Sequence, residues 1–152
     1  MTPSISRRGF LVGTAAGAAT LAGRDLVGAD APAAAAPETL ATRLHASLTP
    51  EQRKAICFAW DYKHPKFGLL RTRVGNNWNA TDPEIAGDFF TKDQRRLVRE
   101  IFEGLIDPAW HERFDKQLED DCGGFGHGQS IALIGEPGSG KFQFLLTGRH
   151  MT

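Results

Sequence analysis

The chain has 152 residues with 18 basic and 18 acidic side chains, so its formal net charge is zero. A balanced charge gives no electrostatic footprint for nucleic acid or for an anionic membrane surface, and we expect neither as a partner. Hydrophobic residues make up 41% of the chain, a content that supports a core and excludes a disordered polypeptide. Length and composition therefore predict one small globular domain.

The N-terminus has the pattern of an export signal. An arginine pair precedes an apolar stretch over residues 11–23 that is rich in Gly and Ala and poor in Leu, Ile and Val. The stretch is shorter than the roughly 20 apolar residues of a transmembrane helix. It resembles the bacterial twin-arginine signal, with these determinants: Ser6, Arg7, Arg8, Phe10 and Leu11.

An Ala/Pro-rich region follows the apolar stretch and offers A-x-A cleavage sites after Ala33, Ala34 or Ala35. We therefore divide the chain into a signal and cleavage region over residues 1–36 and a single domain over residues 37–152. The signal implies the twin-arginine export machinery as a partner and a periplasmic or secreted location. It also implies that no stable membrane span remains after cleavage.

Helices are predicted in the first part of the domain. Leucines at every fourth position predict a helix over residues 38–48, and the capping box Thr49-Pro50-Glu51-Gln52 begins a second helix that runs to about Trp60. A second capping box over residues 91–94 begins a helix with a broad apolar face that extends to Leu105.

A last helix is predicted from Asp107-Pro108 to Gly123. Its residues Trp110, Phe114 and Leu118 recur at every fourth position, and we expect this stripe to belong to the core.

Strands dominate the C-terminal part. A short strand is predicted over residues 67–74, and residues 130–134 and 141–146 predict an antiparallel hairpin joined by a Gly/Pro loop. That loop matches the nucleotide-binding pattern G-x-x-x-x-G-K, but Phe142 replaces the required Ser or Thr and a strand replaces the required helix. The predicted fold class is α+β, with N-terminal amphipathic helices followed by an antiparallel β-hairpin of an incomplete sheet.

Candidate chemical groups are few. His127 and His150 flank the hairpin, and a mixed metal site with Asp120, Asp121 and Cys122 is conceivable, but no spacing is typical of metal ligands, so we assign none. The pairs Asp61–His64 and Asp121–His127 have the residue types of an orienting carboxylate and a general base. Loop hydrogen bonds explain them equally well. Catalytic residues and cofactors are therefore unassigned.

The two cysteines, Cys57 and Cys122, allow one intramolecular disulfide. An oxidising compartment permits that bond, whereas the apolar neighbours of Cys57 favour a buried free thiol. Both alternatives remain open at this point.

Three short motifs follow the leader: Leu48-Thr-Pro-Glu-Gln-Arg53, Phe90-Thr-Lys-Asp-Gln-Arg95 and Leu146-Thr-Gly-Arg-His150. Together they resemble a family of exported bacterial proteins known only as a domain of unknown function. The resemblance implies a mixed α+β architecture. It also implies an N-terminal fragment or a truncated reading frame, because the members compared continue through further strands. The family has no established activity, so it assigns no catalytic residue.

Two function hypotheses remain. The first is an exported, non-catalytic module that binds a ligand or an envelope component, because no catalytic constellation is recognisable and exposed glycine loops are frequent binding sites. The alternative is an extracytoplasmic metal-dependent hydrolase or oxidoreductase that uses His127 and His150. An edge strand near residues 141–149 predicts that the isolated domain oligomerises or aggregates.

Overall fold

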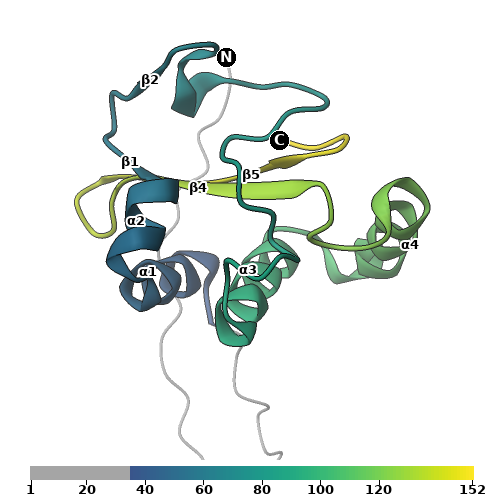
Figure 1. The fold of residues 1–152 in the computed structure, drawn as a ribbon. Helices are drawn as coiled ribbons and strands as arrows, with labels where there is room; N and C mark the ends of the chain where they lie inside the picture. Colours follow the sequence, from purple (N-terminus) through teal and green to yellow (C-terminus); the bar gives the residue numbers. More distant parts are fainter. Residues whose placement is uncertain (1–34) are drawn as a thin grey trace, which may run out of the picture. The chain divides into compact units, whose positions relative to one another are not determined.

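The computed structural model describes residues 35–152, and the export determinants Ser6, Arg7, Arg8, Phe10 and Leu11 lie outside this range. Figure 1 shows the order of the elements. The helices and 3-10 turns are α1 (Pro37–Ser47), α2 (Pro50–Ile56), η1 (Leu70–Thr72), α3 (Lys92–Gly104), η2 (Pro108–Trp110) and α4 (His111–Cys122). The strands are β1 (Cys57–Phe58), β2 (Lys63–His64), β3 (Gly68–Leu69), β4 (Gln129–Glu136) and β5 (Lys141–Gly148).

The predicted α+β class is confirmed, as is the antiparallel hairpin. Strands β4 and β5 pair from Gln129↔Gly148 to Glu136↔Lys141, so the G-x-x-x-x-G-K segment is a hairpin turn followed by a strand. Gly135 has a φ of 78°, and a Cβ there would lie 1.9 Å from the Lys141 carbonyl oxygen. A glycine is therefore required at this position by the hairpin itself.

The predicted end of the second helix was wrong. Helix α2 ends at Ile56, and Cys57 and Phe58 form β1, which pairs in parallel with Leu133 and Ile134 of β4. The main sheet of residues 35–152 consequently has the order β1-β4-β5. The strand predicted over residues 67–74 is shorter than expected, because only β3 pairs with β2 before η1 begins.

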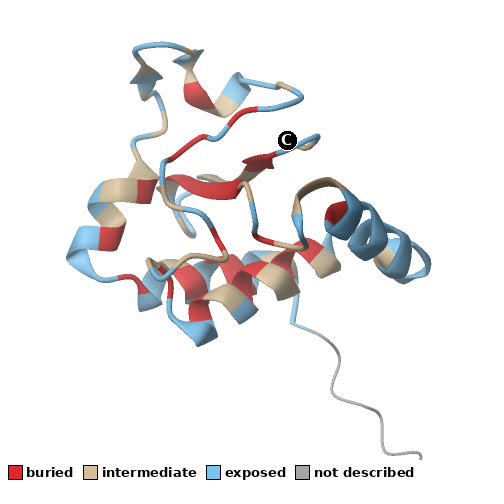
Figure 2. Ribbon diagram, turned by 45° about the vertical axis from the view of Figure 1, so that its right-hand side comes forward, coloured by how far each residue is buried: buried red, intermediate tan, exposed pale blue. Residues whose placement is uncertain are grey.

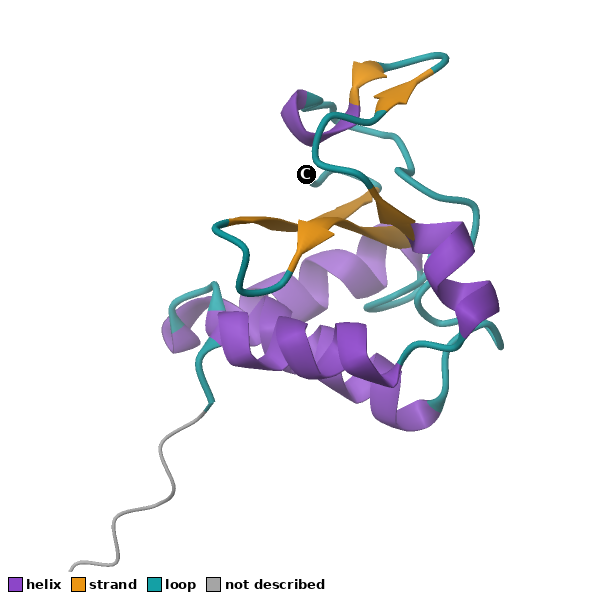
Figure 3. Ribbon diagram, turned by 90° about the vertical axis from the view of Figure 1, so that its left-hand side faces the viewer, coloured by secondary structure: helices purple, strands orange, loops and turns teal. Residues whose placement is uncertain are grey.

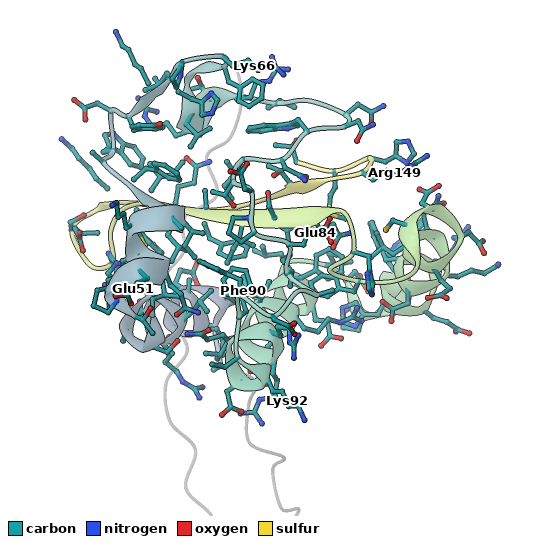
Figure 4. The ribbon with its side chains drawn as sticks, in the orientation of Figure 1. Glu51, Lys66, Glu84, Phe90, Lys92 and Arg149 are labelled. Carbon is teal, nitrogen blue, oxygen red and sulfur yellow. The ribbon has the colours of Figure 1, made fainter. Side chains whose placement is uncertain are left out.

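Strand β4 is buried on both faces. Ile131 and Leu133 pack against the helices, whereas Ala132 and Ile134 pack against the opposite layer. Figure 3 shows the main sheet between the helices on one side and the β2–β3 hairpin with η1 on the other. Figure 4 shows Phe90, which is 2% exposed, pointing into the helix-side interior, and Lys66 standing on the opposite layer.

The layer opposite the helices is held together by aromatic rings. Phe58 stacks on Tyr62 at 4.6 Å between ring centroids, and His64 stacks on Phe67 at 4.5 Å. Phe67 meets the buried Trp78 edge-on at 5.1 Å. These rings and the buried Leu70 of η1 cover this sheet face without an α-helix, and arginines from the same segment lie over several aromatic rings of the layer.

The two predicted capping boxes are confirmed, and they are joined to each other. The Thr49 and Thr91 side chains cap α2 and α3, and Gln52 and Gln94 reach back to the cap amides at 3.0 Å. The two glutamine amides also bond reciprocally, with each Nε2 2.9 Å from the other Oε1. Gln52 also donates to the Phe89 carbonyl at 2.7 Å. A buried amide pair with all these partners stabilises both helix starts at once.

The expected burial of the aromatic residues in the last helix was wrong. Trp110 and Phe114 are 49% and 36% exposed, and Leu118 is the only buried residue of α4. Figure 2 shows α4 at the side of the molecule with most of its surface exposed. The helix does end at Gly123, as predicted, in a left-handed conformation with φ of 86°. None of the helices in residues 35–152 is both long enough and apolar enough to cross a membrane.

The glutamine pair generates a stability prediction. We expect Gln52→Leu and Gln94→Leu each to lower the free energy of unfolding by about 2 kcal/mol, because each leaves buried backbone and amide groups without partners. The double variant should lose less free energy of unfolding than the sum of the two single losses. The second substitution removes an amide that has already lost its partner. Urea denaturation measures all three, with Lys54→Leu on the exposed side of α2 as the control. Additive losses would show that the pair is not coupled.

Candidate functional site

A groove runs along the free edge of β5, the edge strand of the main sheet. It has a volume of about 480 Å³ and includes β5 residues from Gln143 to Leu146. The C-terminal turns of α3, the side of α4, the segment 71–74 and residues 151–152 complete its walls. The groove is therefore built from segments that are far apart in the sequence.

One wall of the groove is strongly apolar. Within residues 35–152 the large hydrophobic side chains that remain exposed are Val74, Leu105, Trp110 and Phe114. Leu105 and Phe114 line this wall, together with Phe102, Ile106 and Leu146, whereas Val74 lies beside Arg73 on the opposite lip. Because isolated exposed apolar residues are ordinary, it is their concentration around one groove that marks a binding surface.

The opposite lip of the groove is cationic. Arg71 lies 4.6 Å above the Trp60 ring, and Arg73 lies 5.4 Å from the Phe67 ring, so both guanidinium groups are held by aromatic faces. The Nε atom of Arg71 is buried and has no hydrogen-bond partner within the described chain. No acidic residue of the described range lines the groove. An anionic group at this lip would thus meet two cations.

Polar links hold the groove walls in place. The Gln143 amide donates to the Arg71 carbonyl at 3.2 Å and ties the cationic lip to β5. On the other side, Arg99 of α3 forms two hydrogen bonds with Asp115 of α4, at 2.6 and 2.8 Å, and the Arg99 interaction lowers the pKa of the Asp115 carboxyl. Phe102 meets Phe114 edge-on at 5.9 Å between ring centroids.

The structure pairs Asp121 with His150, whereas the sequence analysis paired Asp121 with His127. His150 Nδ1 donates to an Asp121 carboxylate oxygen at 2.8 Å, and the Gln117 amide donates to the same oxygen at 2.9 Å. His150 is the only non-glycine residue with a positive φ in the described range, and its backbone amide donates to the Asn76 carbonyl at 2.8 Å. Both side chains remain accessible to solvent.

The other candidate residues are dispersed. His64 Nδ1 accepts a hydrogen bond from the Lys66 amide, so a local backbone contact accounts for it without Asp61. His127 is exposed in the glycine loop. Cys57 and Cys122, both within residues 35–152, are free thiols, and burial raises the pKa of the Cys57 thiol to about 11. A thiol with such a pKa stays protonated and poorly nucleophilic near neutral pH.

Metal ligands do not gather in the described residues. No group of three or more His, Cys, Asp or Glu side chains that could hold a metal ion is found between residues 35 and 152. The Asp121–His150 pair supplies two donor groups at the surface.

Comparisons with known proteins add no assignment. No protein-family model matches the chain, and no curated protein or solved structure matches it. The groove itself was missed by sequence reasoning, because Leu105 and Phe114 occupy positions whose periodicity indicates a core. The remaining evidence on function is therefore the chemistry of the site.

The Asp121–His150 pair predicts a pH effect. Its hydrogen bond lowers the pKa of the Asp121 carboxyl, with Gln117 as a second contributor. A carboxyl whose pKa is lower in the folded than in the unfolded state stabilises the fold at pH values above its unfolded-state pKa of about 4. This stabilisation is lost as the pH falls through the folded-state pKa. We expect His150→Ala to raise the Asp121 pKa toward its ordinary value, as measured by carboxyl-detected NMR titration. His127→Ala is the control, and an unchanged Asp121 titration in His150→Ala would contradict the assignment.

Proposed function

We propose that this protein is an exported, non-catalytic binding module whose groove along β5 takes an amphipathic ligand that carries negative charge. The observation that carries the proposal is the concentration of exposed apolar side chains on one wall of the groove, facing Arg71 and Arg73 on the other. An apolar wall provides the driving force for binding, and a few fixed charged groups provide orientation.

The two guanidinium groups of the lip support the anionic part of the proposal. A ligand carboxylate or sulfonate at the lip would form charge-assisted hydrogen bonds with these guanidinium groups. The aromatic contacts of both arginines already restrict their rotamers, so less side-chain entropy is lost when a ligand binds.

Binding is tested with 8-anilinonaphthalene-1-sulfonate, a probe with an apolar body and one anionic group. We expect saturable binding to the folded protein, weakened at least about tenfold by Leu105→Glu, because that change places a charge on the apolar wall and repels the sulfonate. Trp110→Glu is the matched control, since Trp110 is also exposed but does not line the groove.

Fluorescence titration gives the affinities, and urea denaturation verifies that each variant is folded. Equal binding by wild type and Leu105→Glu would place the probe elsewhere and would overturn the proposed groove.

The export part of the proposal rests on the pattern Ser6-Arg7-Arg8 with Phe10 and Leu11, and on the Ala/Pro-rich region after it. The twin-arginine machinery would deliver the folded protein to the periplasm or the exterior. A module that works there has no need of a membrane span or of nucleic acid as a partner, and its natural ligand and any cofactor remain unassigned. The resemblance to a family of exported proteins agrees with this location.

Export is tested by replacing both arginines of the pair. We expect Arg7→Lys together with Arg8→Lys to retain the uncleaved chain in the cytoplasm, because the signal depends on arginine at both positions. Native intact mass of the envelope fraction should begin near residues 34–36 in the wild type. The control is Arg43→Lys together with Lys54→Arg. Both residues are exposed in the folded domain, and this double variant should leave export intact. An uncleaved wild-type mass would contradict the signal.

A metal-dependent hydrolase or oxidoreductase is the second candidate. The observation in its favour is the 2.8 Å contact between Asp121 and His150, because a carboxylate that fixes a histidine ring is a frequent partner of metal ligands and general bases. The same native mass measurement tests it. We would look for the added mass of a bound metal in the wild type. Its loss in the double variant His127→Ala with His150→Ala would support the metal-dependent enzyme hypothesis.

A further inference from the structure

The free edge of β5 offers backbone hydrogen-bonding groups as well as side chains. Within residues 35–152 the one strand that pairs with β5 is β4, and residues Gln143 to Leu146 line the groove at the other edge. An edge strand presents a row of unpaired N–H and C=O groups that can pair with an extended segment. Such pairing supplies affinity from the main chain and specificity from alternate side chains.

The chain itself begins such a pairing at one end of the edge. After β5, Arg149 and His150 form a tight turn, and Met151 forms an antiparallel bridge with Gly148. The Gly148 amide donates to the Met151 carbonyl at 3.2 Å, and the Met151 amide donates to the Gly148 carbonyl at 3.4 Å. Gly148, two residues beyond the groove residues of β5, therefore already pairs its amide and carbonyl with an antiparallel neighbour at this edge.

The two sides of the groove differ in chemistry. Phe144 and Leu146 pack on the helix side of the sheet, where Phe102 and Leu105 also line the groove. Leu145 packs on the other side, where Arg71 and Arg73 form the lip. Because successive side chains of a strand point to opposite faces, an added strand would direct one set to the apolar wall and the other set to the arginines.

We propose that the groove binds an extended peptide segment of another protein, added antiparallel to β5, in which apolar and acidic residues alternate. This inference rests on the proposed binding function and names its partner class. The apolar side chains pack against the α3 and α4 wall, and the carboxylates pair with Arg71 and Arg73.

Charge complementarity favours such a segment over a second copy of this chain. A second β5 in the groove would direct Gln143, Leu145 and Thr147 to the arginine lip, none of which is acidic. Its ends carry Lys141 and Arg149, which add positive charge to a site that already has two arginines. Like charges at close range disfavour that pairing.

The test uses the 152-residue chain and a short capped peptide in which valine and glutamate alternate. We expect calorimetric binding that slows hydrogen exchange of β5 amides at the groove. A lysine-for-glutamate version of the peptide should bind at least about tenfold more weakly, and Arg73→Glu should reverse this preference. Arg43→Glu on α1 is the matched control, because Arg43 is exposed and outside the groove.

Backbone pairing is tested by N-methylation of alternate peptide amides. Methyl groups on the amides that face β5 should abolish binding, whereas methyl groups on the other set should preserve it. Binding that tolerates both sets would overturn strand addition, and so would a dimer of this chain that excludes the peptide. Failure of the peptide with retained, Leu105-dependent binding of the sulfonate probe would refute the inference and leave the proposed function standing. Failure of both the peptide and the sulfonate probe to bind would refute both the inference and the proposed function.

Discussion

Burial of β4 on both faces is the constraint on which the rest of the structure depends. A strand that is apolar on both faces must be packed against a layer on each side, and the two layers of this chain differ in composition. Helices α1 and α3 cover one face, and the aromatic segment between β1 and Trp78 covers the other. The reciprocal Gln52–Gln94 amides fix the helix starts beneath the sheet. Within residues 35–152 no strand follows β5 in the sheet order, and the groove lies at this outer edge.

Sequence reasoning succeeded where the determinants are local. Each capping box contains its own partners within a few residues, and the β4–β5 hairpin is specified by adjacent strands and a glycine turn. It failed for β1, because Cys57 and Phe58 leave the helix to pair with residues of β4 far along the chain. The spacing of Trp110 and Phe114 is that of a core stripe, yet α4 lies at the side of the fold. Periodicity indicates an apolar face without indicating what covers it.

The candidate site was less accessible from the sequence than the fold. The groove gathers side chains from η1, α3, α4, β5 and the last residues, and no motif links them. Asp121 and His150 show the same limit, since the nearer His127 is the natural choice by sequence and the turn after β5 brings His150 to the carboxylate instead. The two capping boxes are local motifs, and they predict where α2 and α3 begin. The groove, in contrast, is formed by tertiary packing of distant segments.

Helix α4 forms one wall of the groove and lies at the side of the fold. Apart from the buried Leu118, the edge-on ring of Phe114 and the His111 ring beside the Glu103 and Ile106 carbonyls, this helix is joined to the body by partly exposed polar contacts, chiefly Arg99–Asp115 and Asp121–His150. Contacts of this kind contribute little to stability and weaken with ionic strength. Helix α4 is therefore expected to detach as a local unfolding unit at a smaller free energy than the core. Salt concentration would set how often one wall of the groove is open.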